Sequence, residues 1–481
     1  MRIESEMKMK QKIHPLYWLI ILTAPLALWG KMLILPTFDD WNTLSSPNFD
    51  PEWTKYFLSF TSVWRPFDAA FGYLYSLCPG WYPRLSHLVI MAGHLVNTWL
   101  VCLLCRQLST GRQARAIATT LFYLSPCVAA TVWACDALNQ TYSQLWGLLA
   151  VVVYLRTKGW QRYLSWFVLV FMAVLSKENG LAWAVVPPIV EWGMKGGYKR
   201  EQLQSLFLRM LFGLLIAGIY AAIRLSLPHT GDYNPDYQTF DIVRKVKEVG
   251  MLLVNTTMAV DLISILHAPS RNLLTGVATV ALSLPFLWLG YLRRPQLYFT
   301  PKGLSLTASA VIVVSPNLLL SLSMMNAYAS LGMAAVLTAY LIDSQKQKRA
   351  IGYAFLLYLL SALAVEVHAW YCSWQSGLMG RELSQEVIRK TGEPVDRVSF
   401  IIVEDDYPKF SSFCVVPSDA MGWGFEVQHE NRYQWPREVV QVRVGSETTD
   451  TEIDSLAQRA FDDGYDCVWT IRHKDITVKK K

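Results

Sequence analysis

Long apolar runs occupy the first three quarters of the chain and predict its class. The first run extends from Leu16 to Leu35, and similar runs recur as far as Tyr371, separated mostly by short polar segments. Because roughly 20 apolar residues are enough to cross a bilayer as a helix, the pattern predicts an all-α polytopic membrane domain of about 11 helices. The expected spans are 16–35, 85–105, 116–133, 142–155, two that flank the turn 176–180, one that ends near 224, and 274–292, 304–322, 327–342 and 351–371.

Basic residues between the runs predict the orientation of the spans. Such residues hold the adjoining helix end in the cytoplasm. The chain has four of them before the first run: Arg2, Lys8, Lys10 and Lys12. The connection between residues 37 and 84, the longest before residue 370, is then extracytoplasmic.

The segment Val249–His267 leaves the topology of the later spans open. It is apolar enough to cross the membrane, but it contains Asn255 and Asp261. A full crossing would place six late basic residues outside, against the usual bias; they are Arg293, Arg294, Lys302, Lys346, Lys348 and Arg349. We therefore predict a re-entrant or interfacial helix here, and a C-terminal region on the same side as the first connection.

The C-terminal region has a different pattern of short alternating segments. Strands are expected at Val398–Val403, Glu438–Val444 and Cys467–Arg472, and helices at Ser384–Lys390 and Glu452–Phe461. Residues 376–481 contain 14 basic and 19 acidic residues, whereas the rest of the chain contains 30 and 18. We expect a membrane domain over residues 1–374 and a small extracytoplasmic α/β domain over 375–481, in which Cys414 and Cys467 are able to pair in an oxidising compartment.

Composition supports this class and excludes one kind of partner. Of the 481 residues, 53% are hydrophobic and 17% charged, against about a quarter charged in a soluble domain. The net charge of +7 comes from basic connections between spans, so it does not indicate nucleic-acid binding. The partner that the composition indicates is the lipid bilayer.

Polar side chains gather at the expected outer ends of the spans. Ionisable groups near hydrocarbon are costly, so several on one membrane face indicate a site. They are Asp39, Asp40, Arg65, His94, Asp136, Asn139, Gln140, Lys177, Glu178 and Arg224. Structural alternatives exist for four of them: a helix-packing hydrogen bond for His94, a salt bridge between Lys177 and Glu178 within their turn, and a lipid-phosphate contact for Arg224.

The order of these features resembles the GT-C glycosyltransferases, and most of all their branch related to protein O-mannosyltransferases. The resemblance rests on Asp39-Asp40 after the first span, Trp64-Arg65-Pro66 before the second, the turn Ser176-Lys177-Glu178, and Arg224 at the end of the seventh. Ser315-Pro316-Asn317 and Met325-Asn326-Ala327-Tyr328 match that branch's late outer turn loosely, without the Glu-Arg that often precedes its Tyr. The resemblance covers about residues 15–370 and leaves the C-terminal region unexplained.

The resemblance implies transfer of a sugar from a polyprenyl-phosphate donor to a hydroxyl of a glycan, lipid or protein acceptor. Asp39 or Asp40 would be the catalytic base, and Arg224, Lys177 and Arg65 would bind the donor phosphate. Glu178, Asp136, Asn139, Gln140 and His94 would position the acceptor or the sugar. The second carboxylate of the pair is available for a divalent cation. One base and one phosphate leaving group predict inversion at the anomeric carbon.

Two other classes of function remain open at this stage. Asp261 and His267 in an apolar segment are typical of an ion path, so a transporter or flippase is the main alternative. A receptor or assembly subunit that acts through the acidic C-terminal region is another. The short connections and compact C-terminal region favour a bacterial inner membrane, with the site and this region on the periplasmic side.

Overall fold

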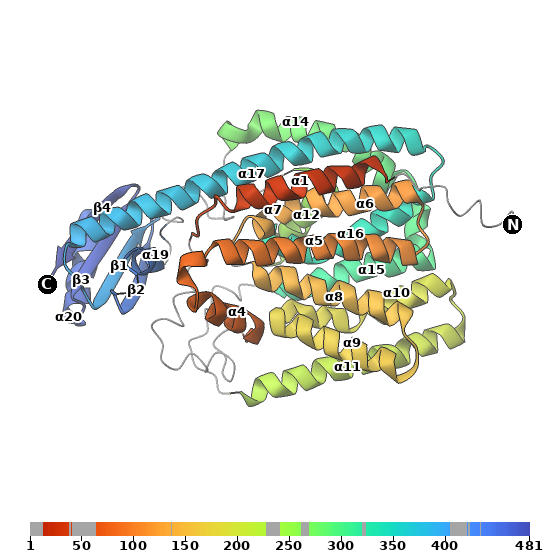
Figure 1. Cartoon of the computed structure of the whole chain (residues 1–481), viewed down its shortest axis with the longest axis horizontal. Coiled ribbons are helices and arrows are strands. Elements are labelled where there is room, and N and C mark those ends of the chain that lie inside the picture. The colour runs from red at the N-terminus through yellow and green to blue at the C-terminus, as the bar shows by residue number, and fades with distance from the viewer. Residues whose placement is uncertain are drawn as a thin grey trace.

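The computed structural model describes residues 13–37, 40, 64–135, 137–227, 241–260, 269–319, 324–404, 421, 424–432 and 434–481. Its helices run along one common direction, and a small sheet lies at one end of the bundle (Figure 1). The expected fold class is confirmed: a multi-span helical domain precedes a small region with a mixed four-stranded sheet.

The elements follow the apolar pattern of the sequence. The helices are α1 Pro15–Lys31, α4 Pro66–Ser76, α5 Arg84–Gln107, α6 Arg112–Leu124, α7 Pro126–Val132, α8 Leu138–Arg156, α9 Gly159–Ser176, α10 Val186–Lys195, α11 Arg200–Ser226, α12 Ile242–Thr257, α14 Pro269–Leu287, α15 Pro301–Val314, α16 Met324–Asp343, α17 Lys348–Thr391, α19 Phe425–Glu430 and α20 Asp450–Asp462. Short 3-10 or π turns are η3 Pro79–Trp81, η4 Glu178–Ala184, η6 Trp288–Leu292, η7 Pro295–Phe299 and η8 Ser315–Leu319.

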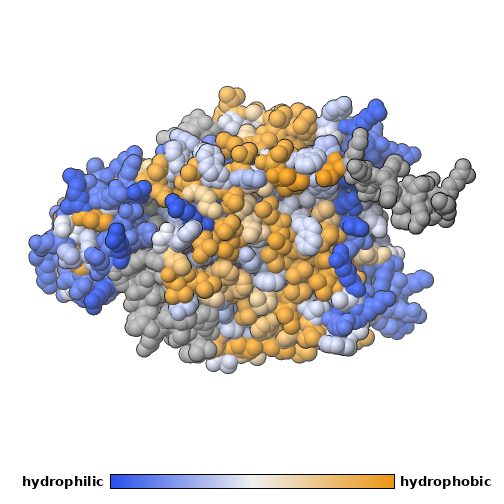
Figure 2. Space-filling view, in the orientation of Figure 1, coloured by the Kyte–Doolittle hydropathy of each residue, from blue (hydrophilic) through white to orange (hydrophobic). Residues whose placement is uncertain are grey.

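The bundle has the dimensions and surface of a membrane domain. Among the described residues, five helices are long and apolar enough to cross a bilayer, or six if α6 and α7, bent by 45°, form one broken span. Figure 2 shows an apolar band across the middle of the bundle and polar residues towards both ends. Apolar side chains on this band face lipid, so their exposure carries no penalty.

The end of α1 departs from the sequence expectation. The apolar run continues to Leu35, but the helix ends at Lys31, whose side chain is fully buried. Its ammonium group donates to the carbonyls of Val132 and Ala134, the latter at 2.9 Å, just beyond α7. Because carbonyls at a helix C-terminus lack partners within the helix, this lysine satisfies them and ties the outer ends of the two helices together.

A single helix, α17, joins the membrane domain to the C-terminal region. Its 44 residues span about 66 Å. Ala369 and Cys372 pack in the bundle, whereas Leu383 and Val387 pack against the sheet. The helix expected at Ser384–Lys390 is therefore only the last part of a longer helix, and the expected boundary at 374/375 lies inside it. No Pro occurs between residues 348 and 391 to break it.

Helices cover both faces of the C-terminal sheet. Its strands are β1 Arg397–Val403, β2 Glu438–Val444, β3 Cys467–Arg472 and β4 Asp475–Lys480, in the order β2-β1-β3-β4. β1 is parallel to both its neighbours, and β4 is antiparallel to β3. The end of α17 covers one face and α20 the other, which explains why β1 is apolar at almost every position. The three expected strands and the helix near 452–461 are confirmed; β4, a charged edge strand, was not foreseen.

Different segments of the chain lie at the two ends of the helical bundle. Gly377 of α17 lies so close to the backbone of Leu35 that a Cβ atom there would meet the Leu35 carbonyl oxygen at 2.6 Å. The C-terminal region therefore lies at the end of the bundle where α1 ends. The turn in which the Asp40 N–H donates to the Thr37 carbonyl, called the Asp40 turn below, follows α1 there. At the other end, Lys302 donates to the Leu108 carbonyl at 2.6 Å, and Gln113 donates to the Lys348 carbonyl at 2.8 Å. This arrangement agrees with the predicted topology.

The segment expected to be re-entrant is described only in part. α12 begins at Ile242, seven residues before the expected start, and has 16 residues, which is short for a span. Its first turns carry ion pairs from Arg244 and Lys245 to Glu248, and its end packs beside α7 through a Cys127 thiol that donates to the Asn255 carbonyl. Asp261 and His267 lie outside the described residues, as does Cys414, so the roles predicted for them stay predictions.

We expect the C-terminal region to be extracytoplasmic. A single cysteine at Ser446, exposed in the loop after β2, should react with a membrane-impermeant thiol reagent in intact cells when all native cysteines have been replaced. A matched cysteine at Lys199, exposed at the other end of the bundle, should react only after the cells are opened. The reverse pattern would show that the predicted orientation is wrong.

Candidate functional site

Asp40 is held in a tight turn by backbone groups. Its carboxylate accepts a hydrogen bond from the Thr37 N–H at 2.8 Å on one oxygen and from the Cys135 N–H at 2.9 Å on the other. The Tyr82 hydroxyl donates to the Asp40 carbonyl. The side chain is 7% exposed. Both oxygens therefore serve to fix the turn against the segment that leads into α8.

An ion pair joins the first outer connection to the turn before α10. Arg65 precedes α4, and its guanidinium donates to Glu178 in η4 through Nε at 3.1 Å and Nη2 at 3.0 Å. Both side chains are about a quarter exposed, at 26% and 24%. Burial disfavours the charged form of Glu178, but Arg65 outweighs this effect and lowers the pKa of the carboxyl. The two-pronged geometry fixes the orientation of both groups.

A second chain of contacts lies beside this pair. Lys177 donates to the Asn139 amide oxygen at 3.4 Å, and the Asn139 amide nitrogen donates to Asp68 of α4 at 2.9 Å. Asn139 is 8% exposed, in the first turn of α8. The amide thus links a cation on η4 to a carboxylate on α4. The sequence does not single out Asp68, although its place in the first turn of a helix that begins with Pro66 is a usable signal.

Tyr220 brings α11 into the same cluster. Its ring stacks on Trp64 with centroids 5.7 Å apart and an interplanar angle of 21°. Its hydroxyl lies close enough to Glu178, Arg224 and Arg65 to respond to all three charges. Arg224 therefore approaches the ion pair from a fourth element, one turn beyond Tyr220 on α11. Nothing local in the sequence marks Tyr220 as part of a site.

Taken together, these groups form one charged cluster at the ends of α4, α8 and α11 and in the turn before α10. Arg65, Lys177 and Arg224 contribute three positive charges, and Asp68 and Glu178 contribute two negative ones. Arg65 is bound to Glu178 and Lys177 to Asn139, while Arg224 lies near the Tyr220 hydroxyl. The Asp40 turn adjoins this site through Cys135, four residues before Asn139.

The structure does not bring every expected residue into this cluster. His94 is buried among helices, where its ring nitrogens lie 3.1 Å from the Tyr328 hydroxyl and 3.2 Å from the Tyr123 carbonyl. Gln140 is 1% exposed, and its amide makes no hydrogen bond to any described residue. Asp39 and Asp136 lie outside the described residues. Within the part of the chain that the structure describes, no three His, Cys, Asp or Glu side chains are grouped to hold a metal ion.

A cavity of about 220 Å³ lies between the segment after α1, the segment before α5 and the C-terminal region. Leu35 and Pro36, which lead into the turn, form part of one wall together with Tyr82. The charged side chains in its lining are Arg84, Arg381, Glu426 and Glu430, and His429 accompanies them. Burial lowers the pKa of His429 to about 4, so its ring is neutral at pH 7. The lining of the cavity therefore carries both signs of charge and includes Leu35 and Pro36, which lie shortly before Asp40.

Comparison with known proteins gives matches in structure only. No protein-family model and no curated protein matches the chain. The structure is similar to the crystal structure of an Archaeoglobus fulgidus oligosaccharyltransferase in complex with Zn and sulfate, with 13% identity and a TM-score of 0.49 over 94% of this chain and 67% of that one. It is also similar to ArnT from Cupriavidus metallidurans bound to undecaprenyl phosphate, with 12% identity and a TM-score of 0.49 over 96% and 97% of the two chains. Similarity at this level does not identify a family or a function.

Proposed function

We propose that the chain is a membrane glycosyltransferase that moves a sugar from a polyprenyl-phosphate donor to an acceptor hydroxyl at the extracytoplasmic face. The observation that supports this most is the cluster in which Lys177, Arg224 and the Arg65–Glu178 pair lie together, close to the segment that binds Asp40. A donor whose lipid stays in the bilayer presents its phosphate at this depth. We also propose that the chain belongs to the branch of the superfamily related to protein O-mannosyltransferases. The proposal covers the class of donor and acceptor and names no particular sugar.

The reaction needs one base and one site for negative charge. The acceptor oxygen attacks the anomeric carbon while its proton passes to a carboxylate, and the bond from that carbon to the phosphate oxygen breaks. The lipid phosphate leaves with an additional negative charge, which Arg224 and Lys177 stabilise. Attack from the side opposite to the leaving group inverts the anomeric centre.

The contacts of Asp40 favour Asp39 as the base. Asp40 uses both carboxylate oxygens to accept backbone N–H groups, so it maintains the turn. Asp39, its neighbour in sequence, lies outside the described residues, and we propose it as the base. Arg65 is bound to Glu178, so we assign it to positioning η4 and its Lys177 rather than to direct phosphate binding.

The cavity beside the Asp40 turn suits the acceptor. It opens between the turn and the C-terminal region and carries both carboxylates and guanidinium groups, which bind hydroxyl-rich molecules through several hydrogen bonds. We therefore propose that the C-terminal region selects the acceptor and takes no part in bond breaking.

A panel of polyprenyl-phosphate sugars tests the function directly. Purified protein in detergent should consume one donor in the presence of a suitable acceptor, or hydrolyse it slowly without one, and release polyprenyl phosphate. Sealed vesicles containing the protein provide the comparison with the transporter alternative. Accumulation of intact substrate inside them, with no consumption of any donor, would contradict the proposal.

Asp39→Asn and Asp40→Asn should have different effects. Asp39→Asn removes the proposed base and should lower turnover roughly 100-fold or more, with an unchanged melting temperature. Asp40→Asn turns an NH2 group towards a backbone N–H and loses a hydrogen bond, so it should lower the melting temperature by several degrees. Near-normal turnover in both folded variants would show that the turn is not catalytic.

Arg224→Ala should weaken donor binding and slow transfer together. The phosphate carries charge before and during the reaction, so KM should rise and kcat should fall. Arg224→Lys should restore only part of the activity, because an ammonium group lacks the planar two-pronged geometry of a guanidinium. The matched control is Arg200→Ala, an exposed arginine at the other end of the same helix, which should leave both constants unchanged. Equal effects of the two alanine variants would contradict the role of Arg224.

A further inference from the structure

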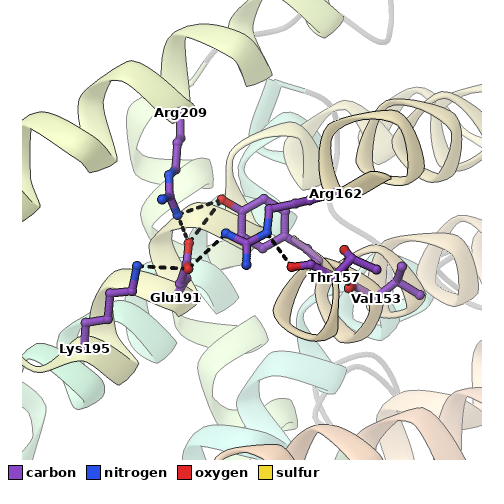
Figure 3. A network of polar contacts seen from close by, with 7 residues as sticks. Val153, Thr157, Arg162, Glu191, Lys195 and Arg209 are labelled. Carbon is purple, nitrogen blue, oxygen red and sulfur yellow. Dashed lines mark hydrogen bonds and ion pairs between the residues drawn. The ribbon is translucent and has the colours of Figure 1, made fainter. Parts of the chain in front are cut away.

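A second charged cluster lies at the opposite end of the bundle. Glu191 of α10 accepts from Arg162 of α9 at 3.1 Å, from Lys195 of α10 at 3.0 Å, and from Arg209 of α11. Figure 3 shows the three cations converging on this one carboxylate. Arg209 and Arg224 belong to the same helix, 15 residues and about 22 Å apart. This cluster is therefore separate from the proposed catalytic site.

The cluster carries more positive charge than its carboxylate balances. Three cations face one anion, which leaves a net charge of +2. The side chains of Arg162, Glu191 and Arg209 are only 14%, 11% and 21% exposed. Excess charge in such a poorly solvated position is costly, and a bound anion would offset it.

Hydrogen-bond donors remain available for such an anion. Within the described residues, Arg209 donates only through Nη1, to Glu191 and to the Tyr154 hydroxyl at 3.3 Å. Arg162 donates through Nε to the Thr157 carbonyl at 2.8 Å and through Nη1 to Glu191, so its Nη2 is unused there. Lys195 is half-exposed and adds an ammonium group. Together they offer several N–H groups to one tetrahedral oxyanion.

The surroundings indicate that the oxyanion belongs to a lipid. Trp160 of α9 is 71% exposed, and Phe207 and Leu208 of α11 are 61% and 65% exposed, so apolar side chains flank the cluster on both helices. Only 17% of the most apolar part of α11 is buried within the protein. Basic groups between spans, next to lipid-facing aromatic residues, are typical of sites for anionic headgroups.

We propose that Arg162, Lys195 and Arg209 bind the phosphate of an anionic phospholipid in the leaflet predicted to be cytoplasmic. Glu191 holds the three cations in place and limits their net charge. The bound lipid would anchor α9, α10 and α11 at this membrane edge. The proposal does not depend on the catalytic function.

The test compares lipid-dependent stability in nanodiscs. Wild-type protein should melt at a higher temperature in discs with phosphatidylglycerol than in discs of phosphatidylcholine alone. Lys195→Gln and Arg209→Gln should each weaken phosphatidylglycerol binding about fivefold and reduce this difference. Glu191→Gln raises the charge of the cluster, so it should enlarge the difference even if it lowers both melting temperatures.

The opposite signs distinguish a lipid site from a purely structural network. A structural network would lose stability equally in both kinds of disc, and the difference would not change in any variant. Arg293→Gln, which removes an exposed arginine at the same end of the bundle, is the control and should leave the difference unchanged. Inorganic phosphate should not reproduce the effect in phosphatidylcholine discs; if it does, the ligand is a soluble anion and the lipid assignment is wrong. Lys195→Gln changes a half-exposed residue, so the test does not depend on variants that fail to fold.

Discussion

The ion pair between Arg65 and Glu178 is the interaction on which the candidate site depends. It joins residues 113 positions apart and fixes the start of α4 against the turn before α10. At a membrane edge an isolated charge of this kind would be strongly disfavoured, so each group requires the other. Once the pair is formed, Lys177 is held next to Asn139 and Tyr220 is held between the pair and Arg224. The geometry of the proposed phosphate site is thus a consequence of charge pairing.

At the turn formed by Thr37 and Asp40, backbone groups likewise need polar partners. Helix ends leave N–H and carbonyl groups without partners, and in a membrane protein water cannot supply all of them. Lys31 satisfies the carbonyls beyond α7, and Asp40 satisfies the N–H groups of Thr37 and Cys135. Gly377 then allows α17 to approach this turn closely. The C-terminal region therefore lies next to the cavity that we propose as the acceptor site.

The sequence predicted features that depend on local pattern and missed those that depend on distant partners. The strands Glu438–Val444 and Cys467–Arg472 agree residue for residue, because alternation and turn residues are local signals. The continuity of α17 was missed because a change of composition near residue 374 was interpreted as a boundary, whereas nothing there breaks a helix. Arg65, Lys177, Glu178 and Arg224 were singled out as ionisable residues at span ends. The pairing of Arg65 with Glu178, and the inclusion of Asp68 and Tyr220, follow only from the way the spans pack.

The two charged clusters share one helix, α11. Arg224 lies two residues before the end of α11, and Arg209 lies 15 residues earlier on the same lipid-facing helix. Their surroundings differ. Arg224 lies beside Tyr220 and the Arg65–Glu178 pair, where we propose that the donor phosphate leaves, whereas Arg209 is bound to Glu191. In our proposals Arg224 therefore stabilises a leaving phosphate, whereas Arg209 binds the phosphate of an anchoring lipid. The groups around each arginine account for the difference between the two roles.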